Sequence, residues 1–386
     1  MPIVFALIAT AIYALATYWL KFPLLADDFI FLVKAHSPDF QLQDFAGLLT
    51  QRPLSSLLNF LALKHHFFEQ TWLLYFYFFL HSLGLMRIVI WLRGSHKSFI
   101  LLCFYPCFFE VLFMRLNLPY CLGTLLLSYA LTSSNSIKRI VLMWLAFCSL
   151  ETYVLPAFIL PLLPTILSQR RSNTLRYTLE WLLALSAYLL TRNALLIPGS
   201  PILAWRFSDM LLTQYISLLF TLHFYKIYWI ETGLFWAAIG ILLIQANRRT
   251  RLAFFILPVA ASLHTIMMDY YAPRAIHGAG IILLALLAHA LSVSKKPLVP
   301  IALLCTAFSL QLGIIFHTRF MNDKILQNLD TQWATTMRSC QEPCILPIHN
   351  LHHDFLRDWI MPPYAWTPFL QWVQLHNGIQ KHIEFR

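Results

Sequence analysis

The chain has 386 residues, of which 59% are hydrophobic and only 12% are charged. A soluble domain carries about 25% charged residues, so a soluble domain of this composition would expose large apolar patches and is excluded. The net charge of +11 does not indicate nucleic-acid binding, because membrane proteins collect Lys and Arg on cytoplasmic loops and the sequence has no phosphate-binding glycine loop or zinc-finger spacing.

Apolar segments long enough to cross a bilayer recur along the whole chain. A transmembrane helix needs about 20 mostly apolar residues. Residues 3–20 lack a basic leader and are expected to be a retained first span. Counting segment 209–224 as a further span would place the basic residues 248–251 on the outer side. An interfacial or re-entrant helix is therefore expected there. The other predicted spans are 71–92, 98–113, 118–132, 138–150, 153–167, 175–195, 229–246, 251–269, 275–293 and 297–317.

Basic residues indicate the orientation of these spans. Because Lys and Arg concentrate on cytoplasmic loops, we expect the amino terminus inside the cell and the carboxyl terminus outside. The chain is predicted to be an all-α polytopic membrane protein of about eleven spans, with a transmembrane domain 1–317, a first outer loop 21–70 and a small outer region 318–386. The inner connections hold twelve basic residues and no acidic one: Arg93, Lys97, Lys138, Arg139, Arg170, Arg171, Arg176, Arg248, Arg249, Arg251, Lys295 and Lys296.

The first outer loop shows two helical patterns. Pro53 stands where a helix accepts proline, at its first position, and apolar residues recur after it with helical spacing. We expect two amphipathic helices on the membrane surface, with ordinary packing against the spans as the alternative. The apolar positions are Phe40, Phe45, Leu48 and Leu49, then Leu54, Leu57, Leu58 and Leu61, with Ser55, Ser56 and Asn59 on the opposite face.

Two adjacent carboxylates, Asp27 and Asp28, follow the first span. Carboxylates packed together repel each other, which raises the pKa of one of them and suits it to act as a general base. Asp is also a good helix cap, so a solvated turn that only caps a helix explains the pair equally well.

Further ionisable or aromatic residues are expected on the same outer side. Individually each can be a structural side chain, but together they favour a site with one carboxylate base and several cations. Transfer from a lipid phosphate donor fits this set, since cations stabilise the charge that grows on the departing phosphate. The candidates are Arg52, His65, His66, Glu110, Arg115, Glu151, Tyr153, Asp269, Tyr271, Arg274 and His277.

The chain resembles the GT-C glycosyltransferases, polytopic enzymes that use polyprenyl-phosphate sugars. The resemblance lies in Asp27-Asp28 after span one, the paired surface helices with Arg52-Pro53-Leu54, and the many spans that follow. Glu151-Thr152-Tyr153 and Pro273-Arg274 resemble bacterial O-antigen glucosyltransferase-like and pilin-glycosylating members.

The resemblance implies an inverting sugar transfer at the periplasmic face of a bacterial inner membrane. Asp27 or Asp28 would be the base, with Asp27 favoured, and Arg274 would bind the donor phosphate with Arg52 or Arg115 and with His277. The acceptor would be a hydroxyl of a glycan, a lipid or a pilin-like protein. A divalent metal is left open as a cofactor: Glu110 or Glu151 could bind one, but nothing in the sequence demands it.

Two other functions remain open: a transporter or flippase of a lipid-linked substrate, and an O-antigen polymerase or ligase. The sequence has no inverted repeat of the kind that transporters often show. In the carboxyl-terminal tail, Cys340 and Cys344 can form a disulfide on an oxidising side, or bind zinc with the nearby histidines, or remain free thiols.

Overall fold

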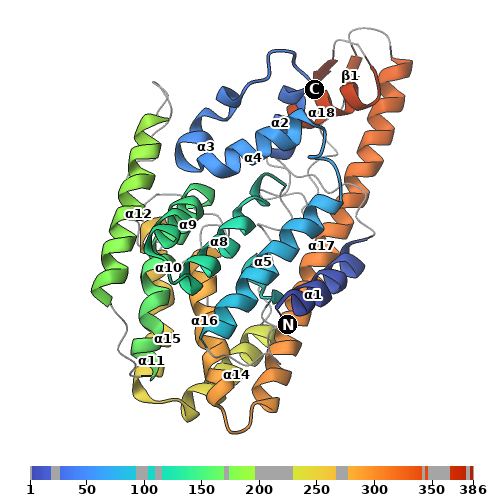
Figure 1. The fold of residues 1–386 in the computed structure, drawn as a ribbon. Coiled ribbons are helices and arrows are strands. Elements are labelled where there is room, and N and C mark those ends of the chain that lie inside the picture. Colours follow the sequence, from blue (N-terminus) through green and yellow to red (C-terminus); the bar gives the residue numbers. More distant parts are fainter. Residues whose placement is uncertain are drawn as a thin grey trace.

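The computed structural model describes residues 2–18, 27–92, 103–108, 115–168, 174–195, 229–266, 277–340, 344–346, 366–379 and 383–385. These residues are almost entirely helical, which confirms the predicted all-α class (Figure 1). Short 3-10 turns, here labelled η, connect several of the helices. Two three-residue strands, β1 (Cys344–Leu346) and β2 (Ile383–Phe385), pair in parallel with Cys344 opposite Ile383.

Every predicted span that the structure describes over most of its length is helical. Segment 98–113 is described only at 103–108, and segment 209–224 lies outside the described residues. The helices are α1 (Pro2–Thr17), α5 (Trp72–Trp91), α8 (Tyr120–Thr132), α9 (Ser136–Ser149), α10 (Val154–Ile159), α11 (Leu163–Ser168), α12 (Thr174–Ala194), α14 (Trp229–Gln245), α15 (Arg248–Ile266), α16 (His277–Val293) and α17 (Leu298–Ser339).

Helix α16 lies at the centre of the bundle. Almost every residue from His277 to Leu291 is buried, so the helix is apolar on all sides, as expected for a helix surrounded by others. Helices α5, α10, α14 and α15 pack against it. The helix ends follow local rules: for example, the Asn135 side chain caps α9 by accepting a hydrogen bond from the Lys138 backbone N–H at 3.0 Å.

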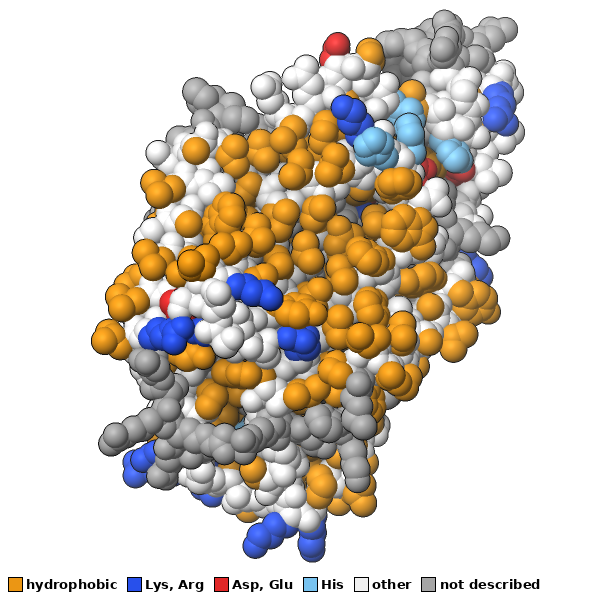
Figure 2. Space-filling model, in the orientation of Figure 1, with side chains coloured by type: hydrophobic (Ala, Val, Ile, Leu, Met, Phe, Trp, Pro, Cys, Tyr) orange, Lys and Arg blue, Asp and Glu red, His pale blue; other side chains and the backbone are white. Residues whose placement is uncertain are grey.

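By length and composition, two described helices could cross a membrane, α5 and α17. Shorter apolar helices are α1, α14, α16 and the segment Glu151–Leu167. Large apolar side chains cover the face of the bundle that Figure 2 displays. Soluble proteins rarely expose apolar patches of this extent. The total of about eleven spans remains a prediction.

Helix α17 is much longer than the span predicted at 297–317. Its 42 residues extend about 60 Å, roughly twice the thickness of the hydrocarbon core of a bilayer. The predicted domain boundary at residue 317 therefore falls inside a continuous helix. The upper part of α17 reaches the end of the molecule where the first-loop helices lie (Figure 1).

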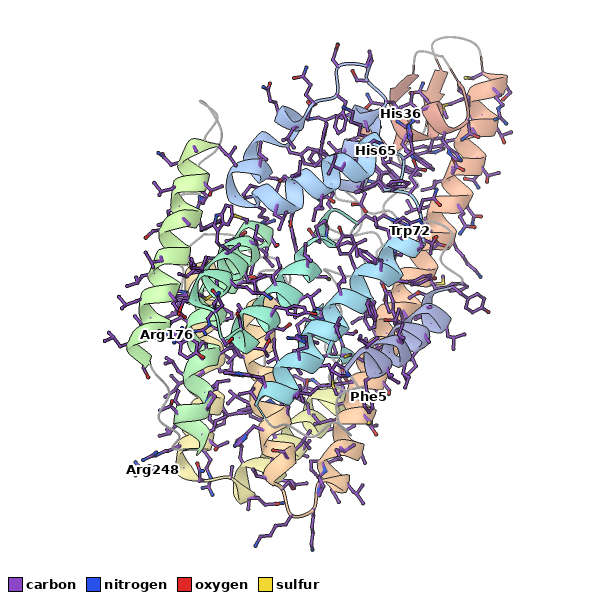
Figure 3. The ribbon with its side chains drawn as sticks, viewed as in Figure 1. Phe5, His36, His65, Trp72, Arg176 and Arg248 are labelled. Atoms are coloured by element: carbon purple, nitrogen blue, oxygen red, sulfur yellow. The ribbon has the colours of Figure 1, made fainter. Side chains whose placement is uncertain are left out.

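The first loop and the carboxyl-terminal residues pack together at that end. The loop forms α2 (Asp27–Ala35), η1 (Leu42–Phe45), α3 (Ala46–Gln51) and α4 (Pro53–Lys64), and helix α18 (Trp366–His376) contacts α2 and α17. The Phe29 ring lies 4.9 Å from Phe369 and 5.6 Å from Trp372, measured between ring centroids. Figure 3 shows Arg248 at the opposite end of the molecule from His36 and His65.

Helix α4 forms as predicted, with Pro53 at its start. Its small polar residues are turned toward the protein, where a helix packed on a core would usually place apolar residues. Ser55, Ser56 and Asn59 are buried, whereas Leu57 and Leu61 are exposed. The Ser55 hydroxyl donates to the Ser149 carbonyl at 2.6 Å, and the Asn59 amide donates to the Leu116 carbonyl at 2.8 Å. The polar face holds the helix to the protein, and Leu57 and Leu61 face outward.

Candidate active site

Asp28 is completely buried at the start of α2. Its carboxylate accepts hydrogen bonds from two backbone N–H groups, that of Leu116 at 3.1 Å and that of Arg115 at 3.3 Å. These two donors belong to η4 (Arg115–Asn117), which follows the predicted third span. Asp28 thus joins the beginning of the first loop to a segment far away in the sequence. The side chain of Asp27 lies outside the described atoms.

The Arg115 side chain is also buried, next to Asp28. Its Nη1 donates to the carbonyl of Phe68 at 2.5 Å and to the carbonyl of Gln70 at 2.7 Å. Burial lowers the pKa of Arg115 to about 10, the Asp28 carboxylate partly opposes that effect, and the nearby positive charge of Arg319 adds to it. A second guanidinium therefore lies close to the first in a site of low polarity.

Arg319 and Asp323 on α17 are buried residues that the sequence did not identify as site candidates. Both Arg319 and Arg115 interact electrostatically with Tyr13 of α1, which locates α17 and η4 around the same place. Asp323 lies one helical turn beyond Arg319 and accepts a hydrogen bond from Gln327 at 2.5 Å. The i, i+4 spacing of Arg319 and Asp323 would place both side chains on one face of a helix. That inference requires the helix to continue past residue 317, where the predicted span ends.

Arg52 and Glu151, both predicted site residues, pair with each other. Arg52 Nε donates to Glu151 Oε2 at 2.7 Å, Nη2 donates to Oε1 at 2.6 Å, and Nη1 donates to the Tyr120 hydroxyl at 2.5 Å. Burial alone would lower the pKa of Arg52, but Glu151 and Tyr120 outweigh it and raise the pKa above its ordinary value. These bonds tie the start of α4 to η5 (Glu151–Tyr153).

His277 and Tyr153 belong to a second buried network, deeper in the bundle. The Thr124 hydroxyl lies 2.8 Å from the Tyr153 hydroxyl, 3.1 Å from His81 Nδ1 and 3.4 Å from His277 Nε2. The Tyr153 hydroxyl in turn donates to the Tyr120 carbonyl at 2.8 Å. His277 is fully enclosed by these groups and by the ring of Phe108 at 4.8 Å.

His65 and His66 lie at the surface, in the turn that follows α4. His66 has a backbone φ of 58°, an uncommon conformation for a residue with a Cβ. The two carbonyls that Arg115 binds, those of Phe68 and Gln70, belong to the same turn. The turn is therefore fixed directly to the buried Asp28–Arg115 pair.

Four predicted site residues cannot be assigned a geometry: Glu110, Asp269, Tyr271 and Arg274 lie outside the described residues. In the part of the chain that the structure does describe, no three His, Cys, Asp or Glu side chains are grouped as metal ligands would be. Cys340 is disulfide-bonded, and its pairing with Cys344 remains a prediction. The side chain of Cys344 is not among the described atoms.

The described residues thus form two distinct buried polar clusters. Asp28, Arg115 and Arg319 make up the first, which we call the carboxylate–guanidinium cluster, and it lies beside the first-loop helices. His81, Thr124, Tyr153 and His277 make up the second. Comparison of the chain with protein-family models, with curated proteins and with solved structures finds no match.

Proposed function

We propose that this chain is a membrane glycosyltransferase that moves a sugar from a polyprenyl-phosphate donor to an acceptor hydroxyl. The observation that carries the proposal is the carboxylate–guanidinium cluster at the start of α2, where Asp28 and two arginines are buried together. Buried ionisable groups at the end of a membrane bundle are costly and mark functional sites. Their chemistry suits a reaction that needs a base and a phosphate-binding cation.

The two neighbouring aspartates have different roles in this proposal. Both oxygens of Asp28 accept backbone N–H groups, which fixes its position and makes it a positioning residue. Asp27, adjacent to it at the first residue of α2, is then the general base. It takes the proton of the acceptor hydroxyl while the hydroxyl oxygen forms a bond to the anomeric carbon of the sugar. The bond from that carbon to the phosphate oxygen breaks, the configuration inverts, and polyprenyl phosphate leaves.

Arg115 and Arg319 are the proposed phosphate ligands. Their positive charges repel each other, and burial disfavours the charged form of Arg115 further. A phosphate bound between them would offset both costs, and the offset grows as negative charge develops on the leaving group. We leave Arg52 out of this role because Glu151 already binds its guanidinium on two sides. Arg274 remains a proposed ligand from the family resemblance.

The proposed location is a bacterial inner membrane, with about eleven spans and with the cluster at the periplasmic face. The distribution of basic residues supports this orientation, since Lys and Arg accumulate on the cytoplasmic side. Arg248, the first residue of α15 in the predicted inner connection 247–251, lies at the opposite end of the molecule from His36 and His65 (Figure 3).

The test is sugar transfer by the purified full-length protein in lipid nanodiscs, with polyprenyl-phosphate-linked hexoses and pentoses as donors. We expect Asp27→Asn to abolish turnover and to leave binding of polyprenyl phosphate intact. The matched control is Asp39→Asn, an exposed aspartate in the same loop. Full activity of Asp27→Asn would remove the proposed base. Transport of the donor across the bilayer, without cleavage of the sugar–phosphate bond, would replace the proposed function by a flippase.

A further inference from the structure

We propose that the exposed face beside α4 and α5 is the site that receives the isoprenoid chain of the donor lipid. Four ring side chains form a continuous row there, His65, Phe67, Trp72 and Phe76, which we call the aromatic ladder. This inference rests on the proposed function for the identity of the lipid. The surface itself is defined by contacts among described residues.

The rings of the aromatic ladder follow one another at nearly constant spacing. The centroid distances are 6.2 Å from His65 to Phe67, 6.1 Å from Phe67 to Trp72 and 6.3 Å from Trp72 to Phe76. Phe67, Trp72 and Phe76 are 50%, 49% and 46% exposed, which is unusual for large rings in contact with one another. Leu57 and Leu61 of α4 face outward on the same helix that leads into the ladder. Together they form an extended apolar surface.

One end of the ladder is polar and basic. Lys64, His65 and His66 follow one another at the end of α4 and are all exposed. In Figure 2, pale-blue histidine side chains border the hydrophobic face at the end of the molecule that carries the first loop. The turn also carries the exposed Glu69, which interacts electrostatically with Arg115. Three consecutive polar or basic side chains, Lys64, His65 and His66, at the end of an otherwise apolar row suit a lipid with a long hydrocarbon chain and a single phosphate.

The turn in the middle of the ladder, between Phe67 and Trp72, is bonded to Arg115 of the carboxylate–guanidinium cluster. Arg115 holds the carbonyls of Phe68 and Gln70, which are the residues between Phe67 and Trp72 in the ladder. The same turn contains His66 in its left-handed conformation, and such backbone strain persists only where the surroundings fix it. A lipid lying on the ladder would therefore have its phosphate next to the proposed site. Other exposed apolar residues, such as Leu183 of α12, lack this connection.

The chemistry selects a polyprenyl monophosphate over an ordinary phospholipid. Aromatic rings at regular spacing offer contacts along an unsaturated, branched chain, whereas the acyl chains of bulk lipid contact all exposed apolar residues alike. The sugar-linked donor is a phosphodiester, as a phospholipid is, so the discrimination rests on the hydrocarbon chain; only the polyprenyl monophosphate that leaves carries a more negative headgroup. We expect the ladder to discriminate between polyprenyl chains and the acyl chains of phospholipids.

The first experiment is photocrosslinking with full-length protein in nanodiscs. A benzophenone amino acid replaces Trp72 in one variant and Leu183 in a control variant, and labelled polyprenyl monophosphate is the probe. We expect labelling at position 72 to exceed that at position 183 at least fivefold, and unlabelled polyprenyl monophosphate to compete while phosphatidylglycerol does not. Equal labelling at the two positions, or equal competition by the phospholipid, would show ordinary annular lipid and overturn the proposal.

The second experiment uses chain length to separate this inference from the proposed function. We expect the double variant Phe67→Ala/Trp72→Ala to raise KM about tenfold for a long-chain donor and to leave KM for a two-isoprene donor unchanged. The control is Leu182→Ala/Leu183→Ala. Sugar transfer with the same chain-length dependence in both variants would refute the ladder and leave the function standing. Selective crosslinking at position 72 without any sugar transfer would refute the function and leave the ladder standing.

Discussion

Arg52 and Glu151 are 99 positions apart in the sequence, yet their side chains form a buried ion pair with two parallel hydrogen bonds. The pair connects the residue that precedes α4 to the turn between α9 and α10. The Tyr120 hydroxyl, at the start of α8, binds the same guanidinium. Three segments of the bundle therefore meet at one arginine, and the position of the first-loop helix depends on it.

Removing one partner of this pair should destabilise the protein strongly. Arg52→Met or Glu151→Leu leaves an uncompensated buried charge, which costs about 3–5 kcal/mol. The double variant removes both charges and should lose much less than the sum of the two single variants. The measurement is a double-mutant cycle on unfolding in mixed micelles. Additive losses would contradict a direct interaction between the two side chains.

Asp28→Asn should reduce stability, in contrast to Asp27→Asn. The amide that replaces the Asp28 carboxylate offers one acceptor oxygen in place of two, so one of the buried N–H groups at residues 115 and 116 loses its partner, at about 1–3 kcal/mol. The measurement is the thermal unfolding midpoint of each variant beside its activity. A fall in the midpoint for Asp27→Asn but not for Asp28→Asn would reverse the two roles.

The substitution Arg115→Lys should make sugar transfer sensitive to alkaline pH. The site lowers the pKa of Arg115 to about 10, from the 12.5 of a free arginine. The same effect on lysine, whose ordinary pKa is near 10.4, gives roughly 8. Phosphate binding needs the protonated form, so the activity of the variant should be lost as the pH rises through about 8, while the natural protein stays active to higher pH. The check is a pH–rate profile of kcat/KM for both proteins, and superimposable profiles would contradict it.

Gly278→Ala should disrupt the junction between α16 and η5. A Cβ at residue 278 would collide with the backbone carbonyl oxygen of Thr152, and neither backbone can move without shifting its helix. We expect a loss of about 1–3 kcal/mol, the usual cost of overpacking. Gly240→Ala on α14 is the control, since no atom of the described residues lies within 4 Å of a Cβ placed there. That variant should gain roughly 0.5–1 kcal/mol from helix propensity. The measurement is the unfolding midpoint of both variants.

Local sequence patterns were sufficient to locate most of the helices of the bundle, although not the full length of α17 or the position of α18. An apolar segment of a given length and a proline at a first helical position are local properties, so α5, α12, α14 and α4 could be predicted close to their observed bounds. The acidic pair at residues 27 and 28 was also visible as a candidate. Its two possible roles were equivalent, because a cap and a catalytic base have the same sequence pattern.

Which polar residues meet depends on the packing of the helices and could not be read from local patterns. The predicted cation Arg52 is bound by Glu151, and the unpredicted Arg319 lies near Arg115, because helices distant in sequence are neighbours in the bundle. A hydropathy pattern ends a span at the first polar residues, so it could not foresee that α17 continues with Arg319 on its buried side. Burial of a charge is set by what packs around it, and that information is spread over the whole chain.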